Sequence, residues 1–453
     1  MVEQSEGRLS PIRAFGVIAM CALLGATAFV AVATANAYDE DLQSDAEDYE
    51  PLDNPRKWTI AMYWASDNNL DEYTEYFVDL WIDELKNRDD VALCVFIDRL
   101  ELPANISTLT EEGWIERASF EEIDSASPET LASFVDYALT EPILAADNFM
   151  LMVQNHGNGY LGLCSDEGVP DSDVLKKWMS IDDLGNGIRT GLETSGGSID
   201  IISLDACTLG TVEIAYELRE LASYLVASQM GVPFDGQNYI ALMSGFTTNP
   251  DISPRDLACK LVDDYGAWYS APLHTLQTLY PYMQDFAALS VVDLKALDPL
   301  KAAFCDFRDV VLPKDNAIGM PFKTASIYAD ASLWMNTMGT WYYPDIIVMF
   351  TTLGDSLRDS RPDVAEACDA IVAAADDAIV HNWASWRFRG IATGLGVFVC
   401  PSIGVFQAYW DADERVYNEV GLDFVTDSGW DLVIMAYSYT MKMYGYAPIT
   451  RTK

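Results

Sequence analysis

The segments FMLMVQNH (residues 149–156) and IDIISLDAC (residues 199–207) decide the fold that this sequence predicts. Each begins with a mostly apolar run, typical of a strand buried on both faces of a sheet. Each ends in a side chain capable of acid–base or nucleophilic chemistry, His156 in the first and Cys207 in the second. Since parallel strands bring their carboxyl ends to one edge of a sheet, we expect these two side chains to lie close together there.

The patterns around these segments predict an α/β fold. Three further buried strands are expected, at residues 58–64, 91–97 and 224–228. Helical patterns alternate with them, at residues 70–87, 130–139, 180–192 and 211–222. In the turn after the first strand, Asp67 and Asn68 are expected to cap the next helix. This alternation predicts a three-layer sandwich around a mainly parallel β-sheet.

The second half of the chain has a more helical pattern. Helices are expected at residues 255–269 and 362–379, and one more strand at residues 395–400. No stretch of linker-like composition separates this half from the first. We therefore expect a core at residues 56–250 and a C-terminal extension at residues 251–453 that packs on it.

The first 37 residues have the pattern of a secretory signal peptide. Two arginines precede an apolar run at residues 14–33, and the sequence ANA at residues 35–37 supplies a cleavage site. The apolar run approaches the roughly 20 residues that span a bilayer, so an uncleaved N-terminal anchor is the alternative. Both interpretations predict a secreted or membrane-anchored protein outside the cytoplasm. Residues 38–55 follow as an acidic linker or short pro-segment.

Composition restricts the partners of this protein. The 453 residues include 27 Lys and Arg but 70 Asp and Glu, a formal net charge of −43. A charge of this sign argues against nucleic acid and against anionic membrane surfaces as partners. The sequence contains neither a CxxC pair nor an HExxH motif, so neither a structural zinc site nor a zincin metal site is expected.

The two strand-end residues suit catalysis by a thiol. Only the thiolate attacks well, and a helix that begins near Cys207 is expected to lower the pKa of the thiol. His156 would exchange protons with this thiol and with the leaving amine. The backbone N–H groups of Gly157 and Cys207 are candidate donors to the oxyanion. The separation of His156 and Cys207, 207 − 156 = 51 residues, agrees with the spacing of about 50 found in caspases.

Several motifs resemble those of the clostripain family of cysteine peptidases. HGNGY at residues 156–160 is similar to the family's histidine motif, and DACTLG at residues 205–210 is similar to its nucleophile motif. WTIAMY at residues 58–63 and TGLGVFVCP at residues 393–401 also resemble family segments. The resemblance covers most of residues 56–440. It implies a caspase-like fold and an endopeptidase that cleaves peptide or protein substrates after Arg or Lys.

The resemblance also implies roles for individual residues. His156 and Cys207 would form a catalytic dyad, and Asp205 would bind the basic side chain of the substrate, as a carboxylate can bind a guanidinium bidentately. Asp235 would be a second acidic residue of the same pocket. The pair Lys176-Lys177 lies between the two motifs, where relatives can be cut. This pair is therefore a candidate self-cleavage site, and an ordinary exposed lysine pair is the alternative.

No pattern in the sequence requires a cofactor. Some members of the resembling family need calcium, so the resemblance makes calcium a candidate ion, although no EF-hand-like spacing is present. Two other functions stand as alternatives. One is a catalytically weak or inactive relative that acts as an extracellular binding module. The other is a redox protein that uses Cys207, which lacks a second cysteine at close spacing.

Overall fold

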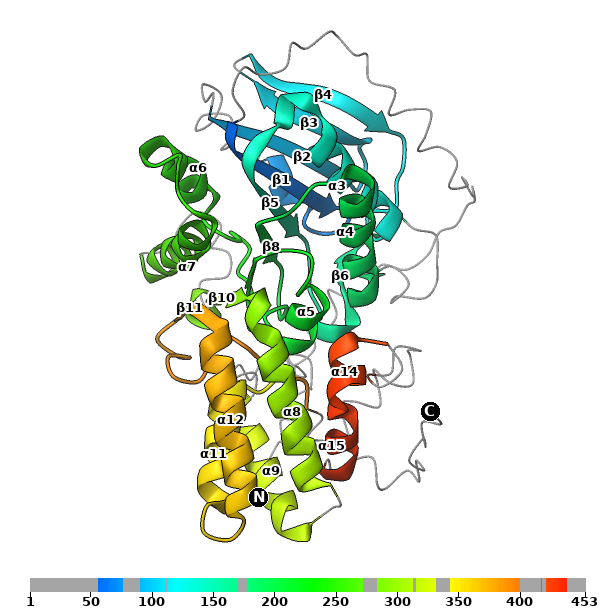
Figure 1. Ribbon diagram of the computed structural model, residues 1–453. Helices are drawn as coiled ribbons and strands as arrows, with labels where there is room; N and C mark the ends of the chain where they lie inside the picture. The colour runs from blue at the N-terminus through cyan, green and yellow to red at the C-terminus, as the bar shows by residue number, and fades with distance from the viewer. Residues whose placement is uncertain are drawn as a thin grey trace, which may run out of the picture.

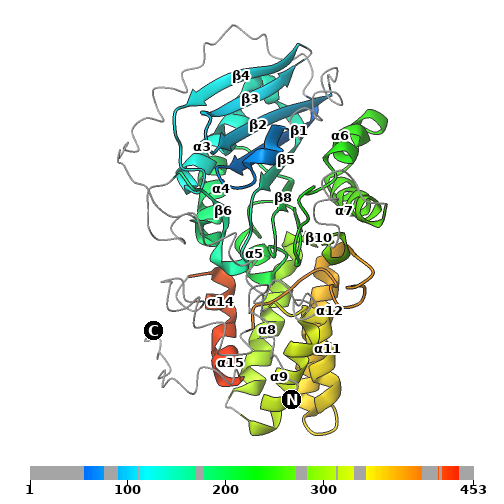
Figure 2. The same cartoon turned by 180° about the vertical axis from the view of Figure 1, so that it is seen from behind.

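The structure, a computed structural model, describes residues 56–75, 90–110, 112–168, 178–271, 283–312, 315–330, 343–399, 417 and 421–437. The expected signal peptide, the acidic linker and the Lys176-Lys177 pair lie outside the described residues. Figures 1 and 2 show the sheet and its helices at one end of the molecule and a group of helices from the second half of the chain at the other end.

Nine strands of the described residues form one sheet in the order β11-β10-β9-β8-β5-β1-β2-β3-β4. The five central strands, from β9 to β2, are parallel, and antiparallel strands extend both edges. The strands are β1 (Arg56–Ser66), β2 (Val91–Arg99), β3 (Ala104–Thr110), β4 (Gly113–Phe120), β5 (Ala146–Gln154), β8 (Ile201–Asp205), β9 (Tyr224–Ala227), β10 (Ala288–Asp293) and β11 (Ile379–Ala384). The predicted α/β fold around a mainly parallel sheet is confirmed.

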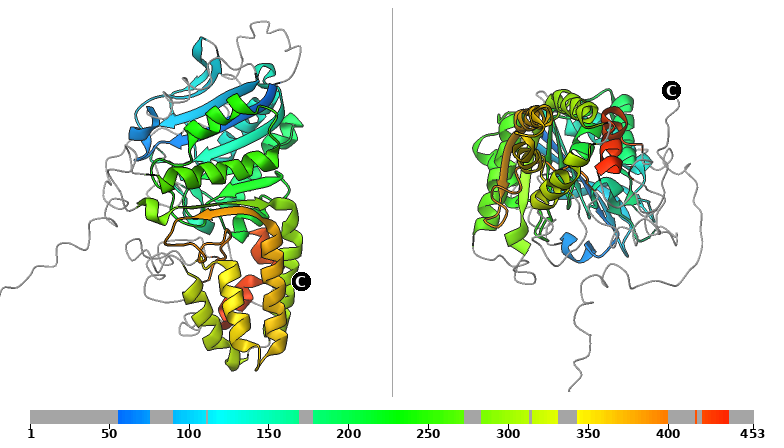
Figure 3. Two further views of the ribbon diagram at one scale, coloured as in Figure 1. Left: turned by 90° about the vertical axis from the view of Figure 1, so that its left-hand side faces the viewer. Right: turned by 90° about the horizontal axis from the view of Figure 1, so that it is seen from below.

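The central strands are buried on both faces, because alternate side chains pack against different helices. Tyr63 of β1 stacks on Phe96 of β2, with 4.6 Å between the ring centroids. The next residue, Trp64, points to the opposite face and packs against Tyr239 of α6 at 5.4 Å. The helices of the first face are α3 (Pro128–Thr140), α4 (Ile181–Ser195) and α5 (Val212–Glu217), and those of the second are α6 (Tyr239–Thr248) and α7 (Pro254–Ser270). Figure 3 shows α6 and α7 lying across the sheet.

The fold departs from the prediction in two places. Strands β3 and β4 have no counterpart among the predicted strands, because they lie half-buried at an edge of the sheet and form no continuous apolar run. The strand expected at residues 395–400 is absent from the described part, residues 395–399. There, Gly396 forms single bridges to Thr211 and Asp345. This segment is extended and buried, but it crosses between two elements instead of pairing along one.

The second half of the chain completes the sheet and then forms a helical group. Strands β10 and β11 join the sheet beside β9. The helices are α8 (Leu297–Val311), α9 (Asn316–Ala329), α11 (Ile346–Leu357), α12 (Pro362–Ala378), α14 (Asp423–Ser428) and α15 (Trp430–Tyr437). At their centre, Phe304 makes edge-on contacts with Phe350 and Trp430, with ring centroids 5.4 and 5.1 Å apart. Within the described part of the chain, no helix has both the length and the apolar character that a membrane span requires.

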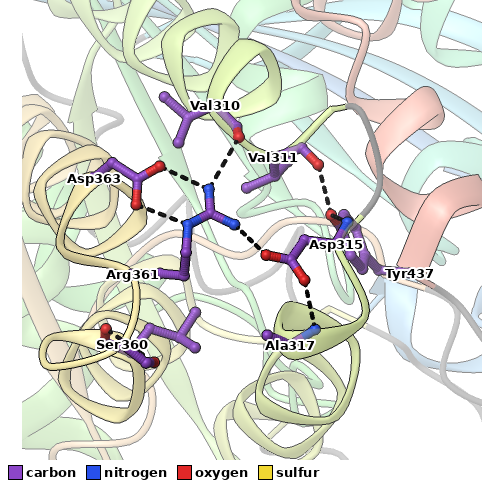
Figure 4. A network of polar contacts seen from close by, with 9 residues as sticks. Val310, Val311, Asp315, Ala317, Ser360, Arg361, Asp363 and Tyr437 are labelled. Carbon is purple, nitrogen blue, oxygen red and sulfur yellow. Dashed lines mark hydrogen bonds and ion pairs between the residues drawn. The ribbon is translucent and has the colours of Figure 1, made fainter.

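An arginine fixes one end of this helical group (Figure 4). Arg361, which precedes α12, donates to both carboxylate oxygens of Asp363 at 2.8 and 2.6 Å and to Asp315 at 2.6 Å. Asp315 caps α9, since its other oxygen accepts from the N–H of Ala317 at 2.8 Å. The hydroxyl of Tyr437 at the end of α15 accepts from the N–H of Asp315 at 3.2 Å. Three helices are therefore joined through one network of ion pairs and hydrogen bonds.

A buried glutamate joins the first half of the chain to the second. Glu213 of α5 is fully buried. Its Oε1 accepts from the N–H of Phe398 and from the hydroxyl of Tyr417, both at 2.8 Å. Burial raises the pKa of this carboxyl. Glu213 is therefore an acceptor on which two distant segments of the chain depend.

Replacing Glu213 should destabilise the fold. In Glu213→Ala, two buried donors lose their acceptor, so we expect the free energy of unfolding to fall by about 3 kcal/mol. Glu213→Gln keeps an oxygen acceptor and should lose less than half of that. Urea unfolding followed by fluorescence measures both, with the exposed Glu220→Ala as the control. Equal losses for Glu213→Ala and Glu220→Ala would contradict this role.

Candidate active site

The structure brings His156 and Cys207 to the same edge of the sheet. Strands β5 and β8 are parallel neighbours, and Gln154 lies opposite Asp205 in their register. His156 and Cys207 each lie two residues beyond this pair. The loops that carry them touch, because a Cβ atom added at Gly157 would lie 2.3 Å from the carbonyl oxygen and 3.0 Å from the nitrogen of Cys207. A residue with a side chain at position 157 would force the two loops apart.

The imidazole of His156 is held by a side chain that the sequence did not predict. Its Nε2 lies 2.8 Å from Oδ1 of Asn69, in the turn after β1. With this oxygen as acceptor, Nε2 carries the proton and Nδ1 is left as the basic nitrogen. Burial lowers the pKa of His156 to about 4, so the ring is neutral at neutral pH. The signal that could have revealed Asn69 is its place at the end of a parallel strand, one residue beyond the expected helix cap.

The predicted capping residues of this turn have mixed roles. Oδ1 of Asn68 accepts from the N–H of Leu70 at 2.9 Å, as a capping side chain does. Its amide nitrogen also donates to the carbonyl of Ser165 at 2.8 Å, which ties the turn to strand β6 (Leu163–Ser165). Asp67 instead accepts from the N–H of Gly168 at 3.0 Å. The turn that carries Asn69 is therefore fixed by the loop after His156.

The thiol of Cys207 is partly exposed and has a backbone partner. Its Sγ accepts from the N–H of Val232 at 3.2 Å, which favours the thiolate. Burial has the larger effect and raises the pKa of the thiol to about 11. The expectation that a helix would lower this pKa is wrong, because α5 begins only at Val212 and has six residues. Thr208, the residue after the nucleophile candidate, has a φ of 59°, a left-handed conformation that is costly for threonine.

Asp205 ends strand β8 and is buried near the thiol. Its Oδ2 accepts from the N–H of Gln237 at 2.9 Å and from the hydroxyl of Tyr239. Its Oδ1 is buried without a hydrogen-bond partner among the described residues. Burial raises the pKa of Asp205 to about 6, although these two hydrogen bonds oppose the change.

The structure also places Asp235 close to Asp205. Burial and then nearby charges, those of both aspartates included, raise the pKa of Tyr269. The hydroxyl of Tyr269 donates at 2.7 Å to the carbonyl of Gly236, the residue after Asp235. The charges of two buried carboxylates therefore act on one tyrosine, close to the edge of the sheet that carries Cys207.

A separate group of acidic side chains could hold a metal ion. One carboxylate oxygen from each of Asp67, Glu122 and Asp166 lies within 4.8 Å of the others. Oxygen ligands of this kind suit hard cations such as Ca²⁺. The group adjoins the turn of Asn69, whereas the thiol and imidazole belong to other loops.

The comparisons place these features among known proteins. The family model described as the clostripain family matches residues 62–437. Clostripain of Hathewaya histolytica is 24% identical over 239 residues, which cover 43% of this chain and 44% of clostripain. This match spans less than half of the length of clostripain.

Two solved structures share the fold at low sequence identity. A secreted C11 cysteine protease from Bacteroides thetaiotaomicron, in complex with an irreversible peptide inhibitor, is 17% identical with a TM-score of 0.57. The match covers 83% of this chain and 100% of that one. An inactive zymogen C11 protease from Parabacteroides distasonis is 18% identical with a TM-score of 0.55, covering 83% and 99%.

Proposed function

This chain belongs to the clostripain family, and from that premise we propose that it is an endopeptidase that cleaves after Arg or Lys through Cys207 and His156. The predicted family and its caspase-like fold are confirmed by the comparisons, and membership of this family supports the proposed enzyme class, cysteine endopeptidase. The observation that carries the choice of residues is the backbone contact between Gly157 and Cys207 at the ends of two paired strands. Hydrolysis of short fluorogenic peptides that end in Arg or Lys, beside matched peptides that end in Leu or Glu, tests the proposal.

In the proposed mechanism, Nδ1 of His156 takes the thiol proton as Sγ of Cys207 attacks the substrate carbonyl. The raised pKa of the thiol and the lowered pKa of the imidazole favour this general-base route over an ion pair formed beforehand. The N–H groups of Gly157 and Cys207 would stabilise the oxyanion. His156 then gives its proton to the leaving amine, and water hydrolyses the thioester. Asn69 is the positioning residue that keeps the proton on Nε2.

The proposed specificity for Arg and Lys depends on buried negative charge. Oδ1 of Asp205 would accept from the basic side chain, and Asp235 would add charge to the same pocket. A buried carboxylate gains most from a cationic partner when water is excluded. The raised pKa of Asp205 is consistent with a carboxyl that lacks such a partner before substrate binds.

The pH dependence should report the state of Asp205. Below about pH 6 its carboxyl is protonated in the free enzyme and cannot pair with a cation, so kcat/KM for Arg peptides should fall toward acid with a midpoint near pH 6. His156, with a pKa of about 4, stays neutral through this range. Bound Arg stabilises the carboxylate, so the acid limb of kcat should lie at lower pH. Rates from pH 4.5 to 8 measure both limbs. A midpoint near pH 6 that persists in Asp205→Asn would contradict this assignment.

We also propose self-cleavage at Lys176-Lys177. Wild-type protein should appear as two fragments on a denaturing gel, and Cys207→Ala should stay as one chain. After both lysines are replaced with alanine, the protein should stay uncut. This variant should be active if the cut is not required for activity, and inactive if the cut is required. If wild type is active and remains one chain, the site is not used.

Two further features belong to this proposal. The pattern of the first 37 residues supports export, with a secreted product or one held by an N-terminal anchor. Calcium is proposed as an accessory ion held by carboxylates, since cleavage by a thiol and an imidazole needs no metal.

The alternative function is a binding module that has lost activity. Wild-type protein that is inactive but still binds Arg peptides would favour this alternative.

A further inference from the structure

An exposed tryptophan lies at the edge of the sheet that carries the thiol, three strands away from β8. In the register of the sheet, Leu204 of β8 lies opposite Ala227 of β9. This row of opposed residues continues across β10 to Asn382 of β11. Cys207 comes three residues after Leu204, and Trp386 comes four residues after Asn382. Because β8 and β11 run in the same direction, both residues lie beyond the strand ends at one edge.

Polar contacts hold this tryptophan in one orientation although it is exposed. Among the described residues, Trp386 is the most exposed large apolar side chain, at 68%. Its Nε1 donates to Oδ1 of Asp285 at 2.9 Å, and Nε of Arg387 donates to Oδ2 of the same carboxylate at 3.0 Å. The guanidinium of Arg387 also lies 4.8 Å from the centroid of the indole ring. An aromatic side chain that is already fixed loses little conformational entropy when a partner binds.

The loop after β9 connects the surroundings of this tryptophan to the thiol. Phe388, two residues after Trp386, belongs to a small buried apolar cluster that includes Met230. Val232, two residues further along the loop after β9, donates its N–H to Sγ of Cys207 at 3.2 Å. One packed loop therefore fixes the position of the segment that carries Trp386 relative to the nucleophile.

The direction of a bound substrate follows from the proposed function, on which this inference rests. His156 follows β5, on one side of β8, and would protonate the leaving amine, so the peptide after the scissile bond would lie toward β5. Asp205 would bind the basic side chain, and its carboxylate faces the other way, where it accepts from the N–H of Gln237 in the loop after β9. Residues before the scissile bond would therefore extend across β9 and β10 toward Trp386.

We propose that Trp386 binds an apolar side chain of the substrate, at the third or fourth residue before the scissile bond. Neighbouring strands lie about 4.8 Å apart, so three strand spacings separate Trp386 from Cys207 by about 14 Å. An extended peptide advances about 3.3 Å per residue, so about four residues cover this distance, and the length of the indole ring brings the third residue within reach. Arg387 is already paired with Asp285, so the subsite offers an aromatic surface for apolar contact.

Hydrolysis of fluorogenic tetrapeptides that end in Arg, by the full-length protein, tests this subsite. Phenylalanine is placed in turn at the second, third and fourth residue before the scissile bond, with alanine elsewhere. At the third or fourth position it should raise kcat/KM about tenfold over the peptide with alanine throughout. Trp386→Ala should remove this difference, and Trp386→Phe should keep most of it. Tyr328→Ala, which removes another exposed aromatic side chain, on α9, is the matched control and should keep all of it.

Equal rates for the phenylalanine and alanine peptides in wild type would overturn the subsite, as would a preference that survives in Trp386→Ala. A preference for phenylalanine at the second position alone would overturn the assigned distance. A wild-type protein that cleaves none of the Arg peptides would refute the proposed function instead. The subsite is then tested by fluorescence anisotropy of the same peptides, labelled and uncleaved, on Cys207→Ala protein. The phenylalanine peptide should bind more tightly than the alanine peptide, and the further variant Trp386→Ala should abolish this difference; equal binding would overturn the subsite.

Discussion

Cys207→Ala should lower kcat/KM for Arg and Lys peptides by about 10⁴-fold or more, because it removes the attacking sulfur. His156→Ala should cause a loss of similar size, since the two residues act in one step. The double variant should be no worse than either single variant, as expected for groups that work as a unit. Fluorogenic peptide hydrolysis with matched protein concentrations measures all three.

The control for this prediction is another partly exposed thiol. Cys259→Ala, on α7, should leave the rate unchanged. Iodoacetamide should inactivate wild type and Cys259→Ala equally. Equal rates for wild type and Cys207→Ala would show that another group carries the chemistry, and a fully additive double variant would separate His156 from the proposed dyad.

Asp205→Asn should abolish the preference for basic residues. Losing one partner of a buried charge pair costs about 3–4 kcal/mol, so kcat/KM for Arg peptides should fall by about 10²–10³-fold. For peptides that end in Leu, kcat/KM should change little, because the leucine side chain forms no ion pair with the carboxylate. The side chain volume is nearly unchanged, and an oxygen remains to accept from Tyr239 or Gln237, so the fold should persist.

The ratio of rates for Arg and Leu peptides is the decisive measurement for Asp205. Asp235→Asn serves as the comparison, and we expect a smaller loss from it because Asp205 lies closer in sequence to the nucleophile. An enzyme that keeps its preference for Arg in Asp205→Asn would refute the role given to Asp205. A wild-type enzyme that prefers Leu or Glu would refute the specificity itself while leaving the dyad intact.

The sequence was sufficient to predict the centre of the fold because apolar runs at the central strands leave few alternatives. Strands β5 and β8 are buried along most of their length, so their runs are unbroken and their ends are clear. The same apolar runs predict that His156 and Cys207 lie at one edge of the sheet, because neighbouring parallel strands have their carboxyl ends at the same edge. The β3–β4 hairpin was missed for the opposite reason, since its strands are half exposed and carry polar residues.

Other parts of the site depend on contacts that have no local signal. Asn69 and Val232 contact His156 and Cys207 from other loops. No sequence pattern predicts the contact of Val232, and the only signal for Asn69 is its place in the turn after a parallel strand. The thiol pKa was predicted in the wrong direction because it depends on burial, and the helix expected to lower it begins too late. More than fifty residues separate β9 from β10, and again β10 from β11. Sequence patterns alone do not reveal that such distant strands are neighbours in the sheet.

The order of the sheet also determines what a cut between residues 169 and 177 would leave. The first piece carries β5 and the histidine, and the second carries β8 and the cysteine, yet these strands are neighbours in the sheet. Strand β6, before the cut, also pairs with strand β7 (Trp178–Met179), after the cut. The product would be a two-chain enzyme whose fragments migrate together in native gel filtration. Each fragment would hold half of the dyad, so activity would depend on a non-covalent interface with the strength of a domain core.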